Sequence, residues 1–376
     1  MIRIEPVIRI EPVSDRRRRR AFLDLPARIH EEDAAWVPPL RMEESRSIDP
    51  RRNAAAAYCD FGSWLAWRHG APVGRVTGIL NRRYAERRGE SVARFGLFEA
   101  VEDRDVVEAL LDAVESWARH RGATSVEGPR GFTDQDPEGL QVEGFEHPTT
   151  LACYQNGPAL PDCVEQAGYA KSADYVVYHF PVPERRHPFY ERILRRVHRE
   201  GRYRLQEFDG RRALLRFSVP ILETMNESFA ELEGYTRLDP GEIRSLARRW
   251  FPFIDPRFVK IVLHGDQVVG FLIAVPNQNE GFRRTRGRLL PAGWLHMLRT
   301  APGPQLDVLL GGVRAEHQGR GVDVLMADAL LRSARDHGFE WMDSHHELES
   351  NFRARHEMER VGGEVWKRYR VYEKRL

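Results

Sequence analysis

The chain has 376 residues, which favours two domains because single hydrophobic cores rarely grow to that length. Its 58 Lys and Arg residues nearly balance its 56 Asp and Glu residues, leaving a formal net charge of +2, so no field of one sign indicates a nucleic-acid or membrane partner. The three cysteines, Cys59, Cys153 and Cys163, lack C-x-x-C spacing, which argues against a disulfide framework and against a structural zinc site.

The N-terminus repeats the hexamer IRIEPV at 2–7 and 8–13, and only one copy can form the first strand. It lacks the apolar core of a signal peptide, and no run in the chain approaches the ~18 apolar residues of a membrane span. Five arginines, Arg16 to Arg20, follow Ser14 and Asp15, either of which predicts a helix cap. We interpret the arginine run as a solvated helix start and expect a cytoplasmic protein.

A longer internal repeat divides the chain into two similar halves. The segments 69–74 and 264–270 match and lie between apolar runs, which predicts two β-hairpins, 64–67 with 76–80 and 259–263 with 271–275. Gly122 and Gly338 each close an amphipathic helix. Near the end of each half the same residues recur at constant spacing: Glu165, Gly168, Tyr175, Val177 and Tyr178 match Glu359, Gly362, Tyr369, Val371 and Tyr372.

Each half also carries an insertion, between Gly128 and Pro158 in the first and between Pro276 and Gln305 in the second. Such long insertions at matching edges are expected to wall a substrate site. The order hairpin, strand, helix, strand, helix, strand predicts an α/β (α+β) unit in each half, with a mixed, mostly antiparallel sheet flanked by helices. The predicted domains are 1–182 and 183–376.

In the second half the apolar run 306–313 meets Gln318-Gly319-Arg320-Gly321 and then an amphipathic segment, which predicts a strand, a glycine turn and a helix start. Such a turn aims unpaired backbone N–H groups at one point in front of the positive helix end, so it suits a phosphate or pyrophosphate. The chain has neither G-x-x-x-x-G-K-[ST] nor G-x-G-x-x-G with an acidic residue about 20 positions on, which argues against a nucleotide triphosphatase and a dinucleotide site.

This segment resembles motif A of the GNAT acyltransferase superfamily, Q/R-x-x-G-x-G/A, with Gln318, Gly321 and Asp323; the last residue departs from the pattern. The element order is also that of the superfamily, so the resemblance implies two tandem GNAT-like domains and acetyl-CoA or another acyl-CoA as co-substrate. It places the pantetheine arm along the strand and the pyrophosphate on the turn. The implied cofactor contacts are Leu310, Gly311, Val313, Gln318, Gly319, Arg320, Gly321 and Asn351.

Acyl transfer to an amine needs a base for the amine and a proton donor for the departing thiolate. The tyrosine of the superfamily pattern is Met358 here, which cannot donate a proton, so Tyr372 is a candidate donor, as are Tyr369, His356 and water. Glu349 is the first candidate base and Glu347 the second. Because residues two apart share a strand face, His345, Glu347 and Glu349 are expected to point into the cleft together.

Other polar residues complete the predicted site. Asn226 and Asn277 are candidate substrate contacts at the cleft edges, as is Asn279. The pair His345 and His346 with its flanking carboxylates matches no standard ligand spacing, so we predict no metal site.

The first half has the acidic segment 99–105 in place of a glycine turn, which would repel a pyrophosphate, so this half is predicted to be architectural.

Three functions remain open from the sequence. The leading hypothesis is an acyl-CoA-dependent N-acyltransferase that acts on a small amine, with the second copy catalytic. An aminoacyl-tRNA-dependent transferase is the alternative, in which the arginines at 283–288 and 16–20 would bind RNA; the near-neutral charge argues against it. A non-catalytic protein that binds acyl-CoA or a metabolite is the third, favoured by Asp323 and Met358.

Overall fold

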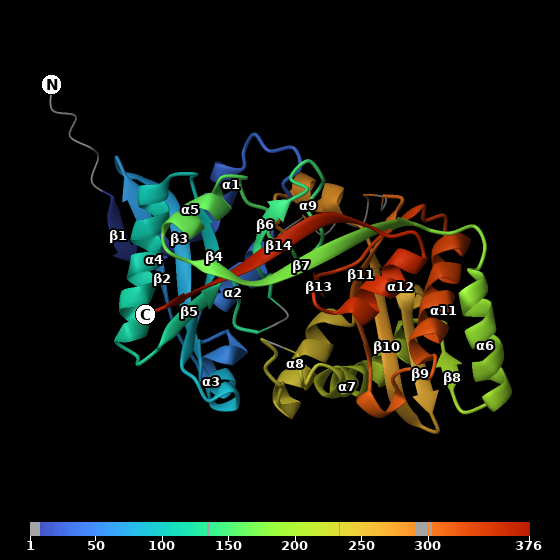
Figure 1. The fold of residues 1–376 in the computed structure, drawn as a ribbon. Helices are drawn as coiled ribbons and strands as arrows, with labels where there is room; N and C mark the ends of the chain where they lie inside the picture. Colours follow the sequence, from blue (N-terminus) through green and yellow to red (C-terminus); the bar gives the residue numbers. More distant parts are fainter. Residues whose placement is uncertain (1–7, 134–135, 233, 290–292, 294–299, 301–302) are drawn as a thin grey trace.

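The computed structural model describes residues 8–376 apart from 134–135, 233, 290–292, 294–299 and 301–302. In these residues a single sheet of 14 strands runs through both halves, in the order β1-β2-β3-β4-β5-β14-β7-β12-β11-β10-β9-β8, with β13 paired to β7 and β6 to β14. The two halves lie side by side, and helices flank the sheet in each (Figure 1). The mixed, mostly antiparallel sheet that the sequence predicts is confirmed, because the parallel pairs in the described residues are β4 with β5 and β11 with β12.

The first half begins with the second copy of the repeated hexamer, which forms β1 and pairs with β2; the first copy lies outside the described residues. Asp15 caps the first helix by accepting a hydrogen bond from the backbone N–H of Arg18 at 2.8 Å. The elements of this half are β1 (Arg9–Pro12), α1 (Arg16–Ile29), α2 (Arg41–Ser47), β2 (Cys59–Arg68), β3 (Ala71–Asn81), α3 (Arg82–Arg88), β4 (Val92–Ala100), α4 (Arg104–Arg119), β5 (Ser125–Gly128), β6 (Leu140–Glu143), α5 (Leu160–Gln166) and β7 (Ala170–Pro181).

The second half repeats this order after a linking helix. Both predicted hairpins are confirmed, and the loop of each has two residues, Gly265-Asp266 in this half. The elements are α6 (Pro188–Glu200), β8 (Arg204–Gln206), α7 (Arg211–Ser228), α8 (Pro240–Trp250), β9 (Val259–His264), β10 (Gln267–Pro276), α9 (Asn279–Thr285), β11 (Gln305–Val313), α11 (Val322–Asp336), β12 (Trp341–Asp343), β13 (Glu347–Leu348), α12 (Phe352–Arg360) and β14 (Glu364–Arg375).

The two halves exchange their last strands. β7, the last strand of the first half, pairs with β12 and β13 of the second half. In return β14 pairs with β5 and β6 of the first half, and the two long strands pair with each other, Tyr175 opposite Tyr369. Figure 1 shows β7 and β14 crossing between the halves. Neither half therefore completes its sheet from its own sequence.

The sheet of the second half buries both of its faces. One face packs under α6, α11 and α12 and carries Val176, Tyr178 and Phe180 of β7; we call it the α11 face. The opposite face packs under α7 and α8, and we call it the α7 face. Alternation along β7 places Tyr175 and Val177 on this side, where they join a small cluster with Tyr369 and Cys153.

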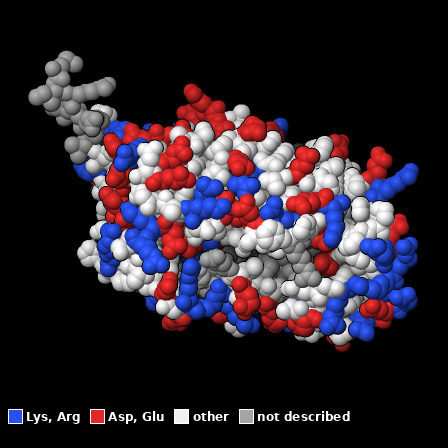
Figure 2. Space-filling view, in the orientation of Figure 1, with Lys and Arg blue, Asp and Glu red and all other residues white. Residues whose placement is uncertain are grey.

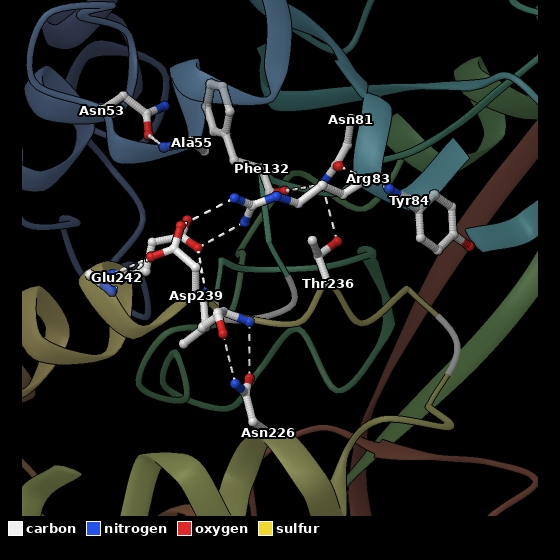
Figure 3. Close-up of polar contacts among 12 residues, drawn as sticks. Asn53, Ala55, Asn81, Arg83, Tyr84, Phe132, Asn226, Thr236, Asp239 and Glu242 are labelled. Carbon is white, nitrogen blue, oxygen red and sulfur yellow. Dashed lines mark hydrogen bonds and ion pairs between the residues drawn. The ribbon is translucent and has the colours of Figure 1, made fainter. Parts of the chain in front are cut away.

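The halves are also joined by polar contacts around α3 and α8. Arg83 donates to Glu242 at 2.9 Å and to Asp239 at 3.1 Å, and Asn81 donates to the hydroxyl of Thr236 at 3.0 Å. Figure 3 shows Arg83 and Asn81 pointing from the first half toward the start of α8 and the loop before it. These contacts hold the α7–α8 hairpin against the first half.

The exchange predicts that the second half cannot fold alone. A fragment 183–376 lacks β7, and the loss of buried Val176 and Phe180 alone removes about 3–6 kcal/mol, a large part of the about 5–15 kcal/mol that stabilises a domain. We expect no cooperative thermal transition for this fragment by circular dichroism. Co-expression with fragment 1–182 should restore a complex that elutes at the size of the full chain. A cooperative transition of 183–376 alone, at the melting temperature of the full chain, would contradict this expectation.

Candidate functional site

Two parallel strands of the second half separate in the middle of the sheet. β11 and β12 pair from Gln305 opposite Trp341 to Asp307 opposite Asp343, where β12 ends. β11 continues along β10 to Val313, with a bulge that leaves Leu309 unpaired. In the described parts of the chain, the other edge of β11 from 310 to 313 has no strand partner, so its backbone groups are open to a ligand. We call this opening, between 310–313 and 344–348, the splay.

The predicted glycine turn follows directly after β11. Gly319 and Gly321 have φ of +70° and +88°, a backbone conformation that glycine adopts without steric strain. Gly321 is the N-cap of α11, so the unpaired N–H groups of the first helical turn lie next to the splay. Asp323 accepts a hydrogen bond from the N–H of Val324 at 3.0 Å, so its carboxylate lies in this first turn.

Helix α6 packs directly against the turn. A Cβ atom on Gly321 would lie 2.7 Å from Cγ2 of Ile193 and 2.8 Å from Cγ2 of Val197. Only a residue without a side chain fits this contact, so any substitution of Gly321 displaces α6. The effect of such a variant on a ligand would therefore include damage to the fold.

Glu347 lies beside the splay. Its carboxyl group forms no hydrogen bond or ion pair with the described residues, although its backbone pairs with β7. It is half-buried and opposite Val176 of β7, so its side chain lies on the α11 face, which also carries Tyr178. Burial raises the pKa of Glu347 to about 7. A carboxyl group with this pKa is suited to general base catalysis near neutral pH.

Glu349 is held in ion pairs on the surface, which separates it from Glu347. Its carboxylate accepts hydrogen bonds from Lys171, at 3.2 Å, and from Arg368. Desolvation opposes the effect, but these two cations lower the pKa of Glu349. A paired carboxylate with a lowered pKa is a weak base, so the geometry favours the second candidate, Glu347, over the first.

His345 does not share a strand with Glu347, because the strand is interrupted between β12 and β13. Glu349 follows the end of β13 and is held in the ion pairs described above, so the expected alternation from His345 to Glu349 is not found. His346 fills this break, with its ring 4.4 Å from the ring of Tyr369, and its Nε2 has no partner in the described residues. Burial lowers the pKa of His345 to about 4. Burial also lowers the pKa of His346. Both rings are therefore neutral at pH 7.

The strand exchange removes Tyr372 from the site. It lies opposite Gly128 of β5, fully buried in the core of the first half. The exchange brings Tyr178 to the splay instead, a residue that the sequence marks only as the repeat partner of Tyr372. Its backbone accepts a hydrogen bond from Ser344 at 2.8 Å, and its hydroxyl accepts from Arg355 at 2.9 Å and donates to Glu359 at 2.9 Å.

Buried charges line the closed end of the splay on the α7 face. Asp307 accepts hydrogen bonds from Gln305 at 2.7 Å and from Asn277 at 2.9 Å. Burial, and then the neighbouring Asp343, raise the pKa of Asp307 to about 7. Sequence patterns gave no sign of this group, because a lone aspartate in an apolar strand has no characteristic spacing.

The other buried charges are held by the exchanged strands and the first insertion. Asp343 contacts Nδ1 of His179 at 2.6 Å, and Lys367 donates to the hydroxyl of Thr150 at 3.1 Å. Burial lowers the pKa of Lys367 to about 8. The insertion of the first half thus covers the central strands, as expected for a wall of the site.

The asparagines predicted to contact substrate are engaged in holding loops. Asn226 is buried, donates to the backbone of Leu238 at 2.7 Å and accepts from it at 2.9 Å (Figure 3). Asn277 holds Asp307, and Asn279 donates to the backbone of Thr149 at 2.7 Å. We therefore assign all three a structural role. Asn351 caps α12 by accepting from Ala354 at 3.4 Å, and its contact with a cofactor stays a prediction.

The arginines that would bind RNA are largely engaged within the chain. Arg283 donates to the backbone of Ala35 and Trp36, Arg284 pairs with Glu280, and Arg18 and Arg19 pair with acidic residues. On the face shown in Figure 2, Lys and Arg side chains are interspersed with Asp and Glu. These observations weigh against the aminoacyl-tRNA alternative.

The first half has no counterpart of the glycine turn. Its helix α4 is capped by Asp103, which accepts from the N–H groups of Asp105 at 3.0 Å and Val106 at 3.3 Å. The Asp103 carboxylate thus bonds to the free N–H groups of the first helical turn, at the place that the glycine turn takes in the second half. The prediction of an acidic helix start is confirmed.

Comparisons with known proteins agree with this architecture. No family model matches the chain. The chain is 29% identical over 377 residues to the bacterial ceramide synthase of Caulobacter vibrioides, covering 97% of each chain, and 26% identical over 373 residues to Protein YghO of Escherichia coli, covering 95% of this chain and 93% of that one. A solved tandem GNAT protein from the clavulanic acid biosynthesis pathway matches with a TM-score of 0.54 at 14% identity over 98% of each chain. The chain therefore has a two-copy GNAT-like fold.

The buried Asp307 predicts a specific dependence of stability on pH. Its pKa rises from 3.8 to about 7 on folding, so the protonated form stabilises the fold fully below pH 4 and this contribution, up to about 4 kcal/mol, is lost as the pH rises to 7. Asp307→Asn should remove this loss of stability with rising pH. The free energy of unfolding in urea, measured from pH 4 to pH 8, should fall less steeply for the variant than for the wild type.

The control for this experiment is Asp266→Asn, a change at an exposed aspartate in the β9–β10 turn. It should follow the wild-type curve. Parallel curves for Asp307→Asn and the wild type would show that Asp307 does not titrate between these pH values.

Proposed function

We propose that the chain is an acyl-CoA-dependent N-acyltransferase whose second half binds the acyl-CoA. The observation that carries the proposal is the splay itself: an open strand edge at 310–313 that leads into a glycine turn and a helix N-terminus. The open edge suits the amide groups of a pantetheine arm, and the turn suits a pyrophosphate. The likeness to the tandem GNAT protein supports the fold on which this reading depends.

The proposed reaction needs little more than a base and a proton donor. Glu347 takes a proton from the amine, directly or through water, and the neutral amine attacks the thioester carbonyl carbon. Unpaired backbone N–H groups at the splay stabilise the oxyanion. The intermediate then expels the CoA thiolate, which takes up a proton as the amide remains. Tyr369 and water stay candidates for the donor of that proton, and Tyr178, whose backbone bonds to Ser344, is a further one.

The acceptor is the least constrained part of the proposal. The name of the Caulobacter vibrioides relative, a bacterial ceramide synthase, favours an amine that carries an apolar chain, because a ceramide is an N-acylated long-chain base. We propose this class ahead of a small polar amine.

Replacing Glu347 separates an enzyme from a non-catalytic binder. Glu347→Gln should lower turnover by about 100-fold or more and leave the affinity for acyl-CoA within about two-fold, because the change keeps the shape and removes the base. In the wild type, activity should fall below about pH 7, where Glu347 takes up a proton. Activity is measured by release of free CoA thiol in a screen of amines.

Glu349→Gln is the matched control, since its carboxylate already pairs with Lys171 and Arg368. It should retain most of the activity. A larger loss in Glu349→Gln than in Glu347→Gln would reverse the assignment of the base. Full activity in Glu347→Gln would show that Glu347 is not the catalytic base.

Asp323 offers a test of the pyrophosphate turn that spares the packing of α6. Its carboxylate lies in the first turn of α11, where it repels a bound pyrophosphate by roughly 1 kcal/mol. Asp323→Asn keeps an oxygen for the N–H of Val324 and removes the charge, so acyl-CoA should bind about five-fold more tightly by calorimetry. The gain should shrink in high salt.

Asp336→Asn, at the other end of the same helix, is the control for this change. It should leave the affinity unaltered. Weaker or equal binding by Asp323→Asn would place the pyrophosphate elsewhere.

A further inference from the structure

The loop that follows α8 holds an apolar side chain out into solvent. Phe253 is 79% exposed, the most exposed large hydrophobic side chain among the described residues. Its neighbours fix it there: Phe251 is buried against α7 and α8, and the N–H of Phe253 donates to the carbonyl of Trp250 at 2.9 Å. The run Trp250–Ile254 is thus an anchored loop with one aromatic ring at its tip. A single exposed apolar side chain is common on protein surfaces, so the interpretation of Phe253 depends on the charged groups near it.

Unpaired arginines surround this tip. Arg244 and Arg248 lie four residues apart on the exposed side of α8, which leads into the loop. The start of α7 adds Arg212, Leu215 and Arg216, all exposed. Among the described residues, none of these four arginines forms an ion pair.

The two helices bring these groups to one place. α7 and α8 form an antiparallel hairpin with a shared core, so the start of α7 lies near the end of α8. Burial acts to raise the pKa of Asp255, but hydrogen bonds from Arg257 and, to a smaller extent, the charge of Arg211 lower it, so the first residue of α7 lies near Asp255. Asp255 itself pairs with Arg257 at 2.6 Å, so it does not neutralise the arginines around the tip. We call the set Phe253, Leu215, Arg212, Arg216, Arg244 and Arg248 the α7–α8 surface.

We propose that the α7–α8 surface docks on an anionic lipid bilayer, with Phe253 inserted among the headgroups. A protruding aromatic ring with cationic side chains around it complements an interface that is apolar below and negatively charged above. Arginine stems also bury apolar length while the guanidinium stays at the phosphates. In the described parts of the chain no helix is long and apolar enough to cross a membrane, so the contact is peripheral.

The inference stands on this surface alone and does not require the proposed chemistry. If the acceptor is an amine with an apolar chain, the surface also explains how the protein reaches it, because such an amine resides in a membrane. The near-neutral net charge of the chain conceals the surface, because acidic residues elsewhere balance its arginines.

Vesicle co-sedimentation of the full-length protein tests the docking. The vesicles contain equal parts of phosphatidylglycerol and phosphatidylcholine, or phosphatidylcholine alone. The wild type should bind the anionic vesicles, more weakly in high salt, and should not bind the neutral ones. Phe253→Ser, and the double variant Arg244→Glu with Arg248→Glu, should each lower the partition coefficient about ten-fold.

Two matched controls address other exposed groups of the same kind. Phe352→Ser changes a phenylalanine that is 64% exposed on α12, and Arg195→Glu changes an arginine whose side chain is 74% exposed on α6. Both should bind vesicles as the wild type does. A thermal transition like that of the wild type, followed by circular dichroism, shows that each variant is folded, and binding of acyl-CoA reports separately on the proposed function.

Three results would overturn the proposal. The first is failure of the wild type to sediment with anionic vesicles while it still binds acyl-CoA, which would leave the proposed function standing. The second is an equal loss of binding in the controls and the surface variants, which would mean that general charge or exposure decides. Equal binding to neutral vesicles would show that the arginines play no part.

Discussion

The pairing of β7 with β14 is the interaction on which the rest of the structure depends. Each strand is the last of its own half and completes the sheet of the other, so the pair closes two sheets that would otherwise end in open edges. Exposed edges invite pairing with other chains, and the exchange satisfies them within one molecule. The first half, which has no glycine turn, is therefore more than a passive copy: it supplies β7, the strand that carries Tyr178 and pairs with β12 and β13 beside the splay.

The same exchange explains the burial of charge at the centre. Where β7 and β14 run together, the insertion of the first half lies over them, and Lys367 bonds to Thr150 of that insertion. Asp307 and Asp343 face each other at the last paired position of β11 and β12. Burying such groups is unfavourable unless they are hydrogen-bonded or opposed by charge. The partners of these groups come from both halves, which ties the polar centre to correct assembly of the whole chain.

Much of the fold could be predicted from the sequence, because its signals are local. The two hairpins follow from apolar runs around short polar loops, and the strand–turn–helix at 306–322 follows from glycines at fixed places. The exchange could not be predicted, since strand pairing across two similar halves leaves the pattern of each strand unchanged. That one feature misplaced Tyr372 and hid Tyr178. The expected alternation of His345 with Glu347 fails for another reason, because the strand is interrupted at 344–346. The role of Glu349 as a base stays a prediction, which its ion pairs with Lys171 and Arg368 disfavour.

The departures from the superfamily pattern gain a physical meaning from the structure. Met358 packs with the core of the α11 face near Tyr178, so the loss of a tyrosine on α12 coincides with a tyrosine hydroxyl that enters the same region from β7. Arg355, three residues before Met358, holds that hydroxyl at 2.9 Å. If the proposed chemistry holds, the proton donor has moved from α12 to β7. Asp323 has no such counterpart, since its carboxylate shares the helix start with the proposed pyrophosphate. The charge at residue 323 thus limits cofactor affinity in the proposed enzyme, whereas the methionine at residue 358 need not limit turnover.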